Sequence, residues 1–274
     1  MDGLYVRRRF SRRLVGQGVE IGPGHVPFPV PEGVGVRYVD RWEPSQNSGL
    51  FPELGESPGF PRPDVVANLD VDRLGGLADE SQDFVIASHV IEHLANPLAM
   101  LVDIHRVLRN GGLLVLLVPD RRTTFDRFRP PTSLAHLVDE YERDVREVDD
   151  DHILEYVIAT RQHEGESGGP EPSGDDLTSD DIEYHRRRSV HAHVWDVDEF
   201  HQLLNFASDE LKLYWTVVDS MAPGEAGTHG DEFGWLLARN DQQTPVGERR
   251  AKRSWLRGAA RKRADRVTIG AQEP

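Results

Sequence analysis

The stretch from Val19 to Asp40 decides the fold of this chain, and it reads VEIGPGHVPFPVPEGVGVRYVD. A short apolar run ends in Gly22-Pro23-Gly24, and a second run, after several prolines, ends at Asp40. This pattern predicts two parallel strands whose carboxyl ends lie side by side, where open α/β sheets bind ligands. Gly22 and Gly24 lack a Cβ, so a ligand can lie against bare backbone, and Asp40 can accept hydrogen bonds from both hydroxyls of a ribose.

The residues around the glycine turn indicate which ribose-containing ligand fits. The prolines after Gly24 remove backbone donors and obstruct a helix, so no helix N-terminus is expected there to seat a pyrophosphate. The Gly-x-Gly-x-x-Gly pattern of dinucleotide sites is also incomplete, because Pro27 stands at its third glycine. Glu20 has the wrong sign for a phosphate but suits the ammonium of a methionyl group. These features together predict S-adenosylmethionine as the ligand.

The composition is that of one large domain with an insertion, and it excludes several function classes. The chain has 274 residues, 38% of them hydrophobic, with a mean hydropathy of -0.53 and a formal net charge of -15. No apolar run is long enough for a membrane span, and the negative charge argues against a nucleic-acid partner. The absence of cysteine excludes disulfides, thiolate catalysis and cysteine metal sites. Because the N-terminus has no apolar signal core, we expect a cytoplasmic protein.

Apolar runs and helix signals alternate along the rest of the chain. Asn96 and Pro97 predict the start of a helix, and Gly111 with Gly112 predicts its end. The other expected elements are strands over Val65–Leu69, Asp83–Ser88 and Leu113–Val118, a helix over Asp198–Phe206, and two final strands over Leu211–Val218 and Glu232–Ala238. This alternation predicts an α/β fold with a doubly wound, Rossmann-like sheet that is mostly parallel and has an antiparallel edge strand.

The charge distribution divides the chain into three parts. Residues 1–127 and 190–240 form the expected ligand-binding core. Residues 128–189 form an acidic insertion, with seventeen carboxylates against three arginines between Asp139 and Glu183. Within it we expect one helix capped by Thr132, a second starting at Asp151, a mobile link over Glu164–Asp181, and a lid position over the crevice. Residues 241–274 form a basic tail.

These motifs resemble those of the class I S-adenosylmethionine-dependent methyltransferases, type 11 branch. Residues 20–24 are similar to the first motif of that family, and Asp40 to its ribose-binding acid. Residues 87–94 and 106–120 are similar to its segments around the fourth and fifth strands. The sequence departs from the family where Val26 replaces the usual third glycine and the proline segment replaces the usual first helix. The resemblance implies that S-adenosylhomocysteine is the product and that these residues contact the cofactor: Glu20, Gly22, Pro23, Gly24, Asp40, Asp70, Ser88 and His89.

A narrower resemblance concerns residues 119–130, His136 and residues 191–195. This set is similar to methyltransferases that accompany glycan and polysaccharide biosynthesis, including those that serve actinobacterial polymethylated polysaccharides. It implies O-methylation of a sugar or polysaccharide hydroxyl. Two alternatives stay open, namely N- or O-methylation of a small metabolite, and a non-catalytic module that binds a partner. The expected partners are a glycan or small hydroxyl-bearing acceptor, with the chain as a monomer or homodimer.

A sugar hydroxyl needs a base to remove its proton, and histidine is the natural base near neutral pH. His191 and His193 are expected on one side of an extended return strand. Asp126 and Arg129 follow the fifth strand, where acceptor contacts are expected. The catalytic candidates are His89, Asp126, Arg129, His136, His191 and His193. A divalent metal bound near Asp149–His152 or at His191 and His193 is an alternative that the pattern does not favour, because consecutive acids do not point to one centre.

Overall fold

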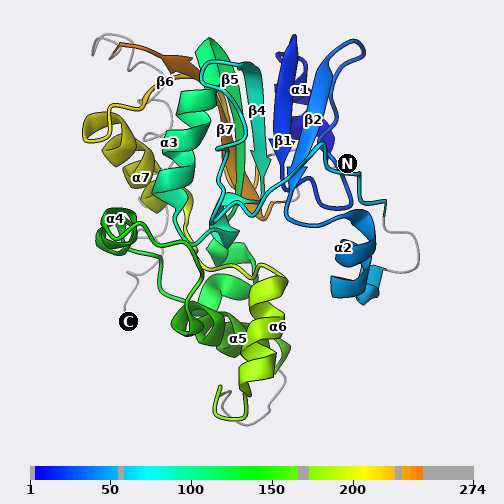
Figure 1. Cartoon of the computed structure of the whole chain (residues 1–274). Helices are drawn as coiled ribbons and strands as arrows, with labels where there is room; N and C mark the ends of the chain where they lie inside the picture. Colours follow the sequence, from blue (N-terminus) through cyan, green and yellow to red (C-terminus); the bar gives the residue numbers. More distant parts are fainter. Residues whose placement is uncertain (1–3, 55–58, 166–172, 226–229, 243–274) are drawn as a thin grey trace, which may run out of the picture.

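A seven-stranded sheet in the order β3-β2-β1-β4-β5-β7-β6 organises the computed structural model (Figure 1). The structure describes the whole chain except residues 1–3, 55–58, 166–172, 226–229 and 243–274. β1 to β5 are parallel, and β7 runs antiparallel to both β5 and β6. The strands are β1 (Gln17–Ile21), β2 (Gly35–Asp40), β3 (Val65–Val66), β4 (Gln82–Ser88), β5 (Leu108–Pro119), β6 (Tyr214–Met221) and β7 (Glu232–Asn240). The mostly parallel, doubly wound sheet expected from the sequence is confirmed.

Helices cover both faces of this sheet. α3 (Pro97–Val107) and α7 (Val197–Asp209) pack on one face in the largest hydrophobic cluster, and α1 (Leu4–Ser11) contributes Phe10 to the cluster on the other. Asn96 caps α3 as expected, accepting a hydrogen bond from the backbone N–H of Ala99. Burial on both faces explains why β4 and β5 read as continuous apolar runs.

The start of the fifth strand differs from the sequence expectation. α3 ends at Val107, as expected, but β5 begins at Leu108 instead of Leu113, because Leu108 already pairs with Gln82 of β4. Both glycines therefore lie inside β5, beside an irregularity in its pairing with β4.

The third strand is shorter than expected. It has two residues instead of the five in Val65–Leu69. Asn68 and Asp72 accept backbone N–H groups of their own turn, and such local bonds compete with a strand ladder.

The insertion forms three helices, α4 (Leu134–Glu142), α5 (Asp150–Glu164) and α6 (Ser179–Arg187), below the sheet in the view of Figure 1. Ser133 rather than Thr132 caps α4, and Asp149 caps α5, whose expected start was Asp151. Instead of capping a helix, Thr132 exchanges two hydrogen bonds with Val194. α6 was not predicted, and its first residues fall within the segment expected to be a mobile link. A capping box between Thr178 and Asp181 holds its start.

The expected return strand over 190–195 is absent from the described part of the chain. We call these residues the return segment, and their only ladder contact there is the isolated bridge between Asp120 and Trp195. Side chains of the insertion bind this segment in place of a neighbouring strand. Arg129 donates to the carbonyls of His191 and Ala192, and the hydroxyl of Thr132 accepts the N–H of Val194.

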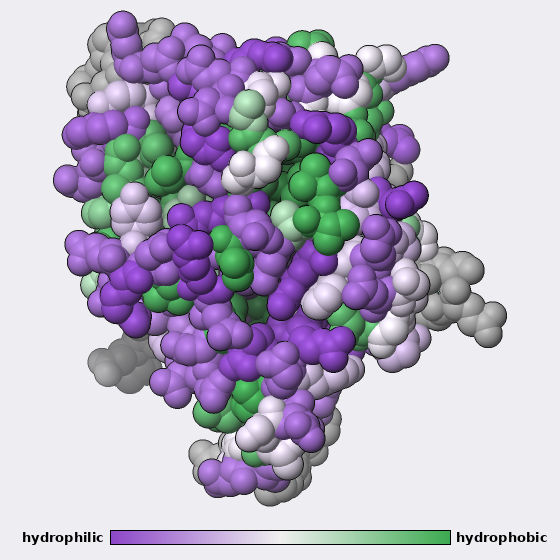
Figure 2. All heavy atoms as spheres, viewed as in Figure 1, coloured by the Kyte–Doolittle hydropathy of each residue, from purple (hydrophilic) through white to green (hydrophobic). Residues whose placement is uncertain are grey.

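Two short helices lie between β2 and β3. α2 (Pro44–Leu50) and the 3-10 helix over Pro52–Leu54 follow β2. Among the described residues no helix combines the length and apolar character that a bilayer crossing needs. Hydrophilic side chains cover most of the face shown in Figure 2.

Candidate active site

A cavity of about 480 Å³ lies at the carboxyl ends of β1, β2 and β4. Five of the predicted cofactor contacts line it, namely Gly22, Gly24, Asp40, Asp70 and His89. Three others, Glu20, Pro23 and Ser88, are not part of its lining. The parallel strands therefore bring the glycine turn and two acidic groups to one space, as the sequence predicted.

The glycine turn after β1 presents bare backbone to this cavity. Gly22 and Gly24 have φ angles of +55° and +59°, a left-handed conformation that disfavours any side chain. The N–H of Gly22 donates to the carbonyl of Val39 at 2.9 Å, which joins the turn to β2. A Cβ on Gly24 would have no protein atom within 4 Å, so the open space beside it is available to a ligand.

Asp40 and Asp70 are the acidic groups of the cavity. One oxygen of Asp40 accepts the N–H of Trp42 at 3.3 Å, and one oxygen of Asp70 accepts the N–H of Ala95 at 2.8 Å. Burial raises the pKa of both carboxyls above the ordinary value, against the effect of these N–H donors. Backbone N–H groups hold each carboxylate in place, and the remaining lone pairs of the carboxylates can accept hydrogen bonds from hydroxyl or amine donors.

Glu20 is buried inside β1 on the sheet face that carries the cluster of Phe10 and Phe28. One of its oxygens accepts the N–H of Phe28 at 2.8 Å, and the other has no hydrogen-bond partner among the described residues. Burial raises the pKa of Glu20 to about 7. The carboxyl therefore holds the proline segment against the sheet, a role that its position before the glycine turn did not reveal.

His89 directly follows β4 and has a left-handed conformation with φ of +57°. Its Nε2 lies 2.7 Å from an Oε2 of Glu232 in β7, and its Nδ1 lies 3.6 Å from Glu92. Burial opposes the charged form, but the hydrogen bond to Glu232 and the nearby Glu92 outweigh it and raise the pKa of His89. Because the carboxylates of Glu232 and Glu92 lie beside it, His89 is better suited to carry a positive charge on the cavity wall than to remove a proton from the molecule to be methylated.

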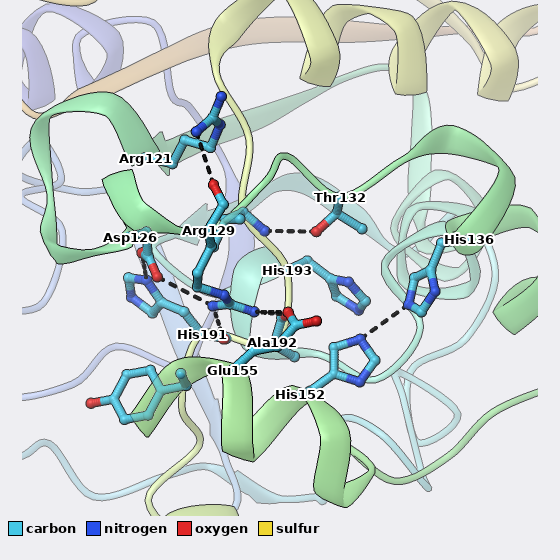
Figure 3. Close-up of polar contacts among 12 residues, drawn as sticks. Arg121, Asp126, Arg129, Thr132, His136, His152, Glu155, His191, Ala192 and His193 are labelled. Carbon is cyan, nitrogen blue, oxygen red and sulfur yellow. Dashed lines mark hydrogen bonds and ion pairs between the residues drawn. The ribbon is translucent and has the colours of Figure 1, made fainter. Parts of the chain in front are cut away.

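His191 of the return segment also lines the cavity, and Asp126 and Arg129 orient it (Figure 3). Its Nδ1 lies 2.6 Å from Oδ2 of Asp126. Arg129, which is 4% exposed, donates to Asp126 at 3.2 Å and to the carbonyls of His191 and Ala192 at 2.7 and 2.8 Å. Three of the predicted catalytic residues thus form one connected group, in which Arg129 binds the backbone that carries the imidazole.

Sequence reasoning missed the neighbours of this group. The ring of His93 lies against that of His191 at 4.8 Å between centroids, and burial lowers the pKa of His93. Phe125 and Tyr156, which also line the cavity, pack edge to face at 5.5 Å. The spacing of His93, one helical turn after His89, was the available signal in the sequence.

His136 and His193 lie outside the cavity, in a second cluster with Glu140 and His152. The expectation that His191 and His193 share one side is wrong, because the return segment is not a regular strand and the two rings contact different groups. Burial and the neighbouring His152 lower the pKa of His193 well below its ordinary value, and burial raises that of Glu140 to about 8. Glu140 was not predicted, although it follows His136 by one helical turn.

The sheet order, the backbone-lined glycine turn and the acid ending β2 define the class of protein that the sequence predicted. Residues 53–116 match the family model described as a methyltransferase domain, a span that contains β4, α3 and most of β5. The matched span, together with the sheet order and the lining of the cavity, supports an S-adenosylmethionine-dependent methyltransferase activity.

Comparisons of the whole fold give distant likenesses. A SAM-dependent methyltransferase from Aquifex aeolicus is 14% identical, with 86% of this chain and 88% of that chain covered and a TM-score of 0.44. A possible histamine N-methyltransferase from Thermotoga maritima is 17% identical, with coverages of 87% and 89% and a TM-score of 0.45. A structure assigned to the zinc-dependent alcohol dehydrogenases of Rhodobacter sphaeroides is 12% identical, with coverages of 85% and 89% and a TM-score of 0.49. The comparison with curated proteins found no match.

Proposed function

We propose that this enzyme transfers the methyl group of S-adenosylmethionine to a hydroxyl group of a sugar or polysaccharide. The observation that carries the proposal is the imidazole of His191 on the cavity wall, with its Nδ1 held 2.6 Å from Asp126. A hydroxyl needs a base to become a good nucleophile, whereas an amine does not need one to the same degree. An oriented imidazole–carboxylate pair therefore favours an oxygen acceptor.

The cavity residues suit the methyl donor. The open backbone at Gly24 and the carboxylates of Asp40 and Asp70 would hold its ribose and adenine end. The proline segment offers no helix N-terminus to a pyrophosphate, since no helix follows β1 before β2. When bound, the donor supplies a methyl carbon activated by a positive sulfur.

The reaction then requires mainly position and proton transfer from the protein. The bond from Nδ1 to Asp126 directs the basic lone pair of His191 to Nε2, which would accept the hydroxyl proton of the acceptor. The bound donor would supply its methyl carbon to the oxygen whose proton His191 accepts, and the electron pair of the carbon–sulfur bond would stay on sulfur. The products would be a methyl ether, S-adenosylhomocysteine and the proton held by His191.

The wall beside His191 supports a sugar as the acceptor. Phe125 lies 5.0 Å from His191 between ring centroids, and Tyr156 lies beside Phe125. An aromatic face next to polar groups suits a ring with an apolar side and hydroxyl edges. Burial raises the pKa of Tyr156, so its phenol stays protonated near neutral pH and can donate to such an edge.

The variant His191→Asn tests the base. Its amide can still donate to Asp126, but it cannot take up a proton. We expect kcat to fall by about 10²- to 10⁴-fold, with unchanged calorimetric affinity for S-adenosylhomocysteine. His163→Asn, at an exposed position of α5, is the matched control.

The acceptor class is measured with isotopically labelled methyl donor and a panel of oligosaccharides, small hydroxylated metabolites and amines. Labelled methyl ethers on sugars support the proposal. Transfer to amines alone, full activity of His191→Asn, or cofactor binding without transfer to any acceptor of the panel would each contradict it.

A further inference from the structure

Four side chains outside the cavity converge on one point. His136 and Glu140 come from α4, His152 from α5 and His193 from the return segment. The Nε2 of His136 lies 3.0 Å from Nε2 of His152 and 2.9 Å from Oε1 of Glu140. Glu140 also lies 3.6 Å from Nε2 of His152 and 3.4 Å from Nε2 of His193. Figure 3 shows the three rings turned toward one another.

The polar atoms of this cluster are buried without enough partners. Both ring nitrogens of His193 and one oxygen of Glu140 have no hydrogen-bond partner within the part of the chain that the structure describes. The side chains of His193 and Glu140 are 0% and 4% exposed. Leaving such groups unsatisfied is unfavourable, and a cation at the centre would bind Nε2 of His193 and a carboxylate oxygen of Glu140 together.

We propose that His136, Glu140, His152 and His193 bind one zinc ion. Zinc takes imidazole nitrogens and carboxylate oxygens at about 2.0–2.2 Å, so the corners of its tetrahedron lie about 3.3 Å apart. Nε2 of His136, Nε2 of His152 and Oε1 of Glu140 lie 2.9, 3.0 and 3.6 Å apart, and Nε2 of His193 lies 3.4 Å from the other oxygen of Glu140. The ligand atoms of the four residues all lie within 4.8 Å of one another. Three imidazoles also favour a transition metal over magnesium, which prefers oxygen ligands.

The surroundings of the ligands fit a metal centre. Oδ1 of Asp149 lies 2.6 Å from Nδ1 of His152, so a carboxylate orients that ring and leaves Nε2 for the ion. The side chain of Asn96 donates to the backbone carbonyl of Glu140 at 3.0 Å, which attaches the end of α4 to the start of α3. These two contacts hold His152 and Glu140 in place, and the ligand atoms of both residues point toward the centre of the cluster.

The site is structural rather than catalytic. All four zinc positions would be filled by protein, as in closed structural sites, and none of the four residues lines the cavity. His136 is the most exposed of the four, with 40% of its side chain exposed against 10% for His152. The ion would join α4 and α5 to the return segment two residues from His191, and so fix the insertion against the core.

Zinc binding is tested on full-length protein made without a histidine tag and stripped with a chelator. We expect one zinc per chain by elemental mass spectrometry and a visible absorption spectrum of tetrahedral cobalt after cobalt replaces zinc. Magnesium should not bind by calorimetry. Zinc at a hundredfold excess over its Kd should raise the Tm by roughly 5–10 °C, and chelator should reverse the shift.

Variants assign the ligands. His136→Ala and Glu140→Gln should lose zinc affinity by more than the roughly 10- to 100-fold expected for the positioning variant Asp149→Asn. His136 is half-exposed, so His136→Ala is the ligand variant most compatible with folding. Glu140→Gln preserves the shape of the side chain. His163→Ala removes an exposed histidine of α5 and should bind zinc normally.

Two outcomes would overturn the proposal. One is a stripped protein whose zinc content and Tm do not respond to added zinc. The other is equal zinc binding by wild type, His136→Ala and Glu140→Gln. Each readout is independent of methyl transfer, so failure of the proposed sugar methylation leaves this result unchanged, and the reverse also holds.

Discussion

Asp40 is the residue on which ribose binding depends. It ends β2, lines the cavity, and has one oxygen bound to the N–H of Trp42. Hydrogen bonds to a charged group contribute about 1.5–3 kcal/mol each, so Asp40→Ala should weaken S-adenosylhomocysteine by roughly 10- to 150-fold by calorimetry. Asp64→Ala is the control, because Asp64 accepts a backbone N–H of the same strand but lies outside the cavity lining. Equal affinity of the two variants would exclude Asp40 as a ligand.

Glu20 gives the molecule a pH-dependent contribution to stability. Burial raises its pKa from 4.5 to about 7, so between these values the folded state binds more protons than the unfolded state. This contribution is fully present below pH 4.5 and is lost as the pH rises through 7, by on the order of 3 kcal/mol. Glu20→Gln keeps an acceptor for the N–H of Phe28 and does not titrate.

Urea unfolding from pH 4 to 8 measures this effect. The stability of Glu20→Gln relative to wild type should rise with pH across that window. The difference between the two proteins isolates Glu20 from the other titrating groups, provided that the sites are independent. Parallel stability curves for the two proteins would show that the carboxyl is not desolvated.

At the residue scale, candidate catalytic residues could be predicted from the sequence, but which of them contact one another could not. Asp126, Arg129 and His191 were each predicted, yet their connection spans 65 positions between Asp126 and His191. His191 and His193 are two residues apart but belong to different clusters, because the side chains of an irregular segment do not alternate between two sides as those of a strand do. Glu140 and His93 carried only the weak signal of helical spacing to another histidine.

Among the elements, the glycine turn after β1 allows a matched test of cofactor contact. Gly24 and Gly33 both have left-handed φ angles, +59° and +83°, and a Cβ on either would meet no protein atom within 4 Å. Alanine at each position should therefore destabilise by a similar amount, about 1–2 kcal/mol in urea unfolding. Only Gly24 lines the cavity, so only Gly24→Ala should lose affinity for S-adenosylhomocysteine, by about tenfold or more. Unchanged affinity would show that the ligand does not approach this turn.

Element types were predictable where burial alone determined them. β4 and β5 lie between two helical layers and read as unbroken apolar runs, and α3 begins at its predicted cap. The prediction failed where local hydrogen bonds or distant contacts decide. The short β3 ends in a turn held by Asn68 and Asp72, and α6 has no buried residue among those described to mark it in the sequence.

At the scale of the whole molecule, the sheet order brings three distant segments to one cavity. The parallel strands β1, β2 and β4 supply the glycine turn, Asp40 and His89, while the insertion and the return segment supply Tyr156 and His191. The order of strands beyond β4 and the course of the insertion depend on contacts between segments far apart in the chain. The sequence therefore predicted the donor side of the cavity better than the acceptor side.

The same architecture should discriminate between nucleotides. Dinucleotide sites seat a pyrophosphate on a helix N-terminus after the first strand, whereas here β1 leads to a proline segment held by Glu20 and then to β2. S-adenosylhomocysteine at a hundredfold excess over its Kd should raise the Tm by roughly 5–10 °C, because ligands that bind only the folded state stabilise it by mass action. Reduced nicotinamide dinucleotide at the same concentration should leave the Tm and its own fluorescence unchanged. Asp40→Ala should lose most of the shift with S-adenosylhomocysteine, which ties the effect to the cavity. A comparable shift with the dinucleotide would mean that the glycine turn accepts a pyrophosphate without a helix, contrary to the argument from its prolines.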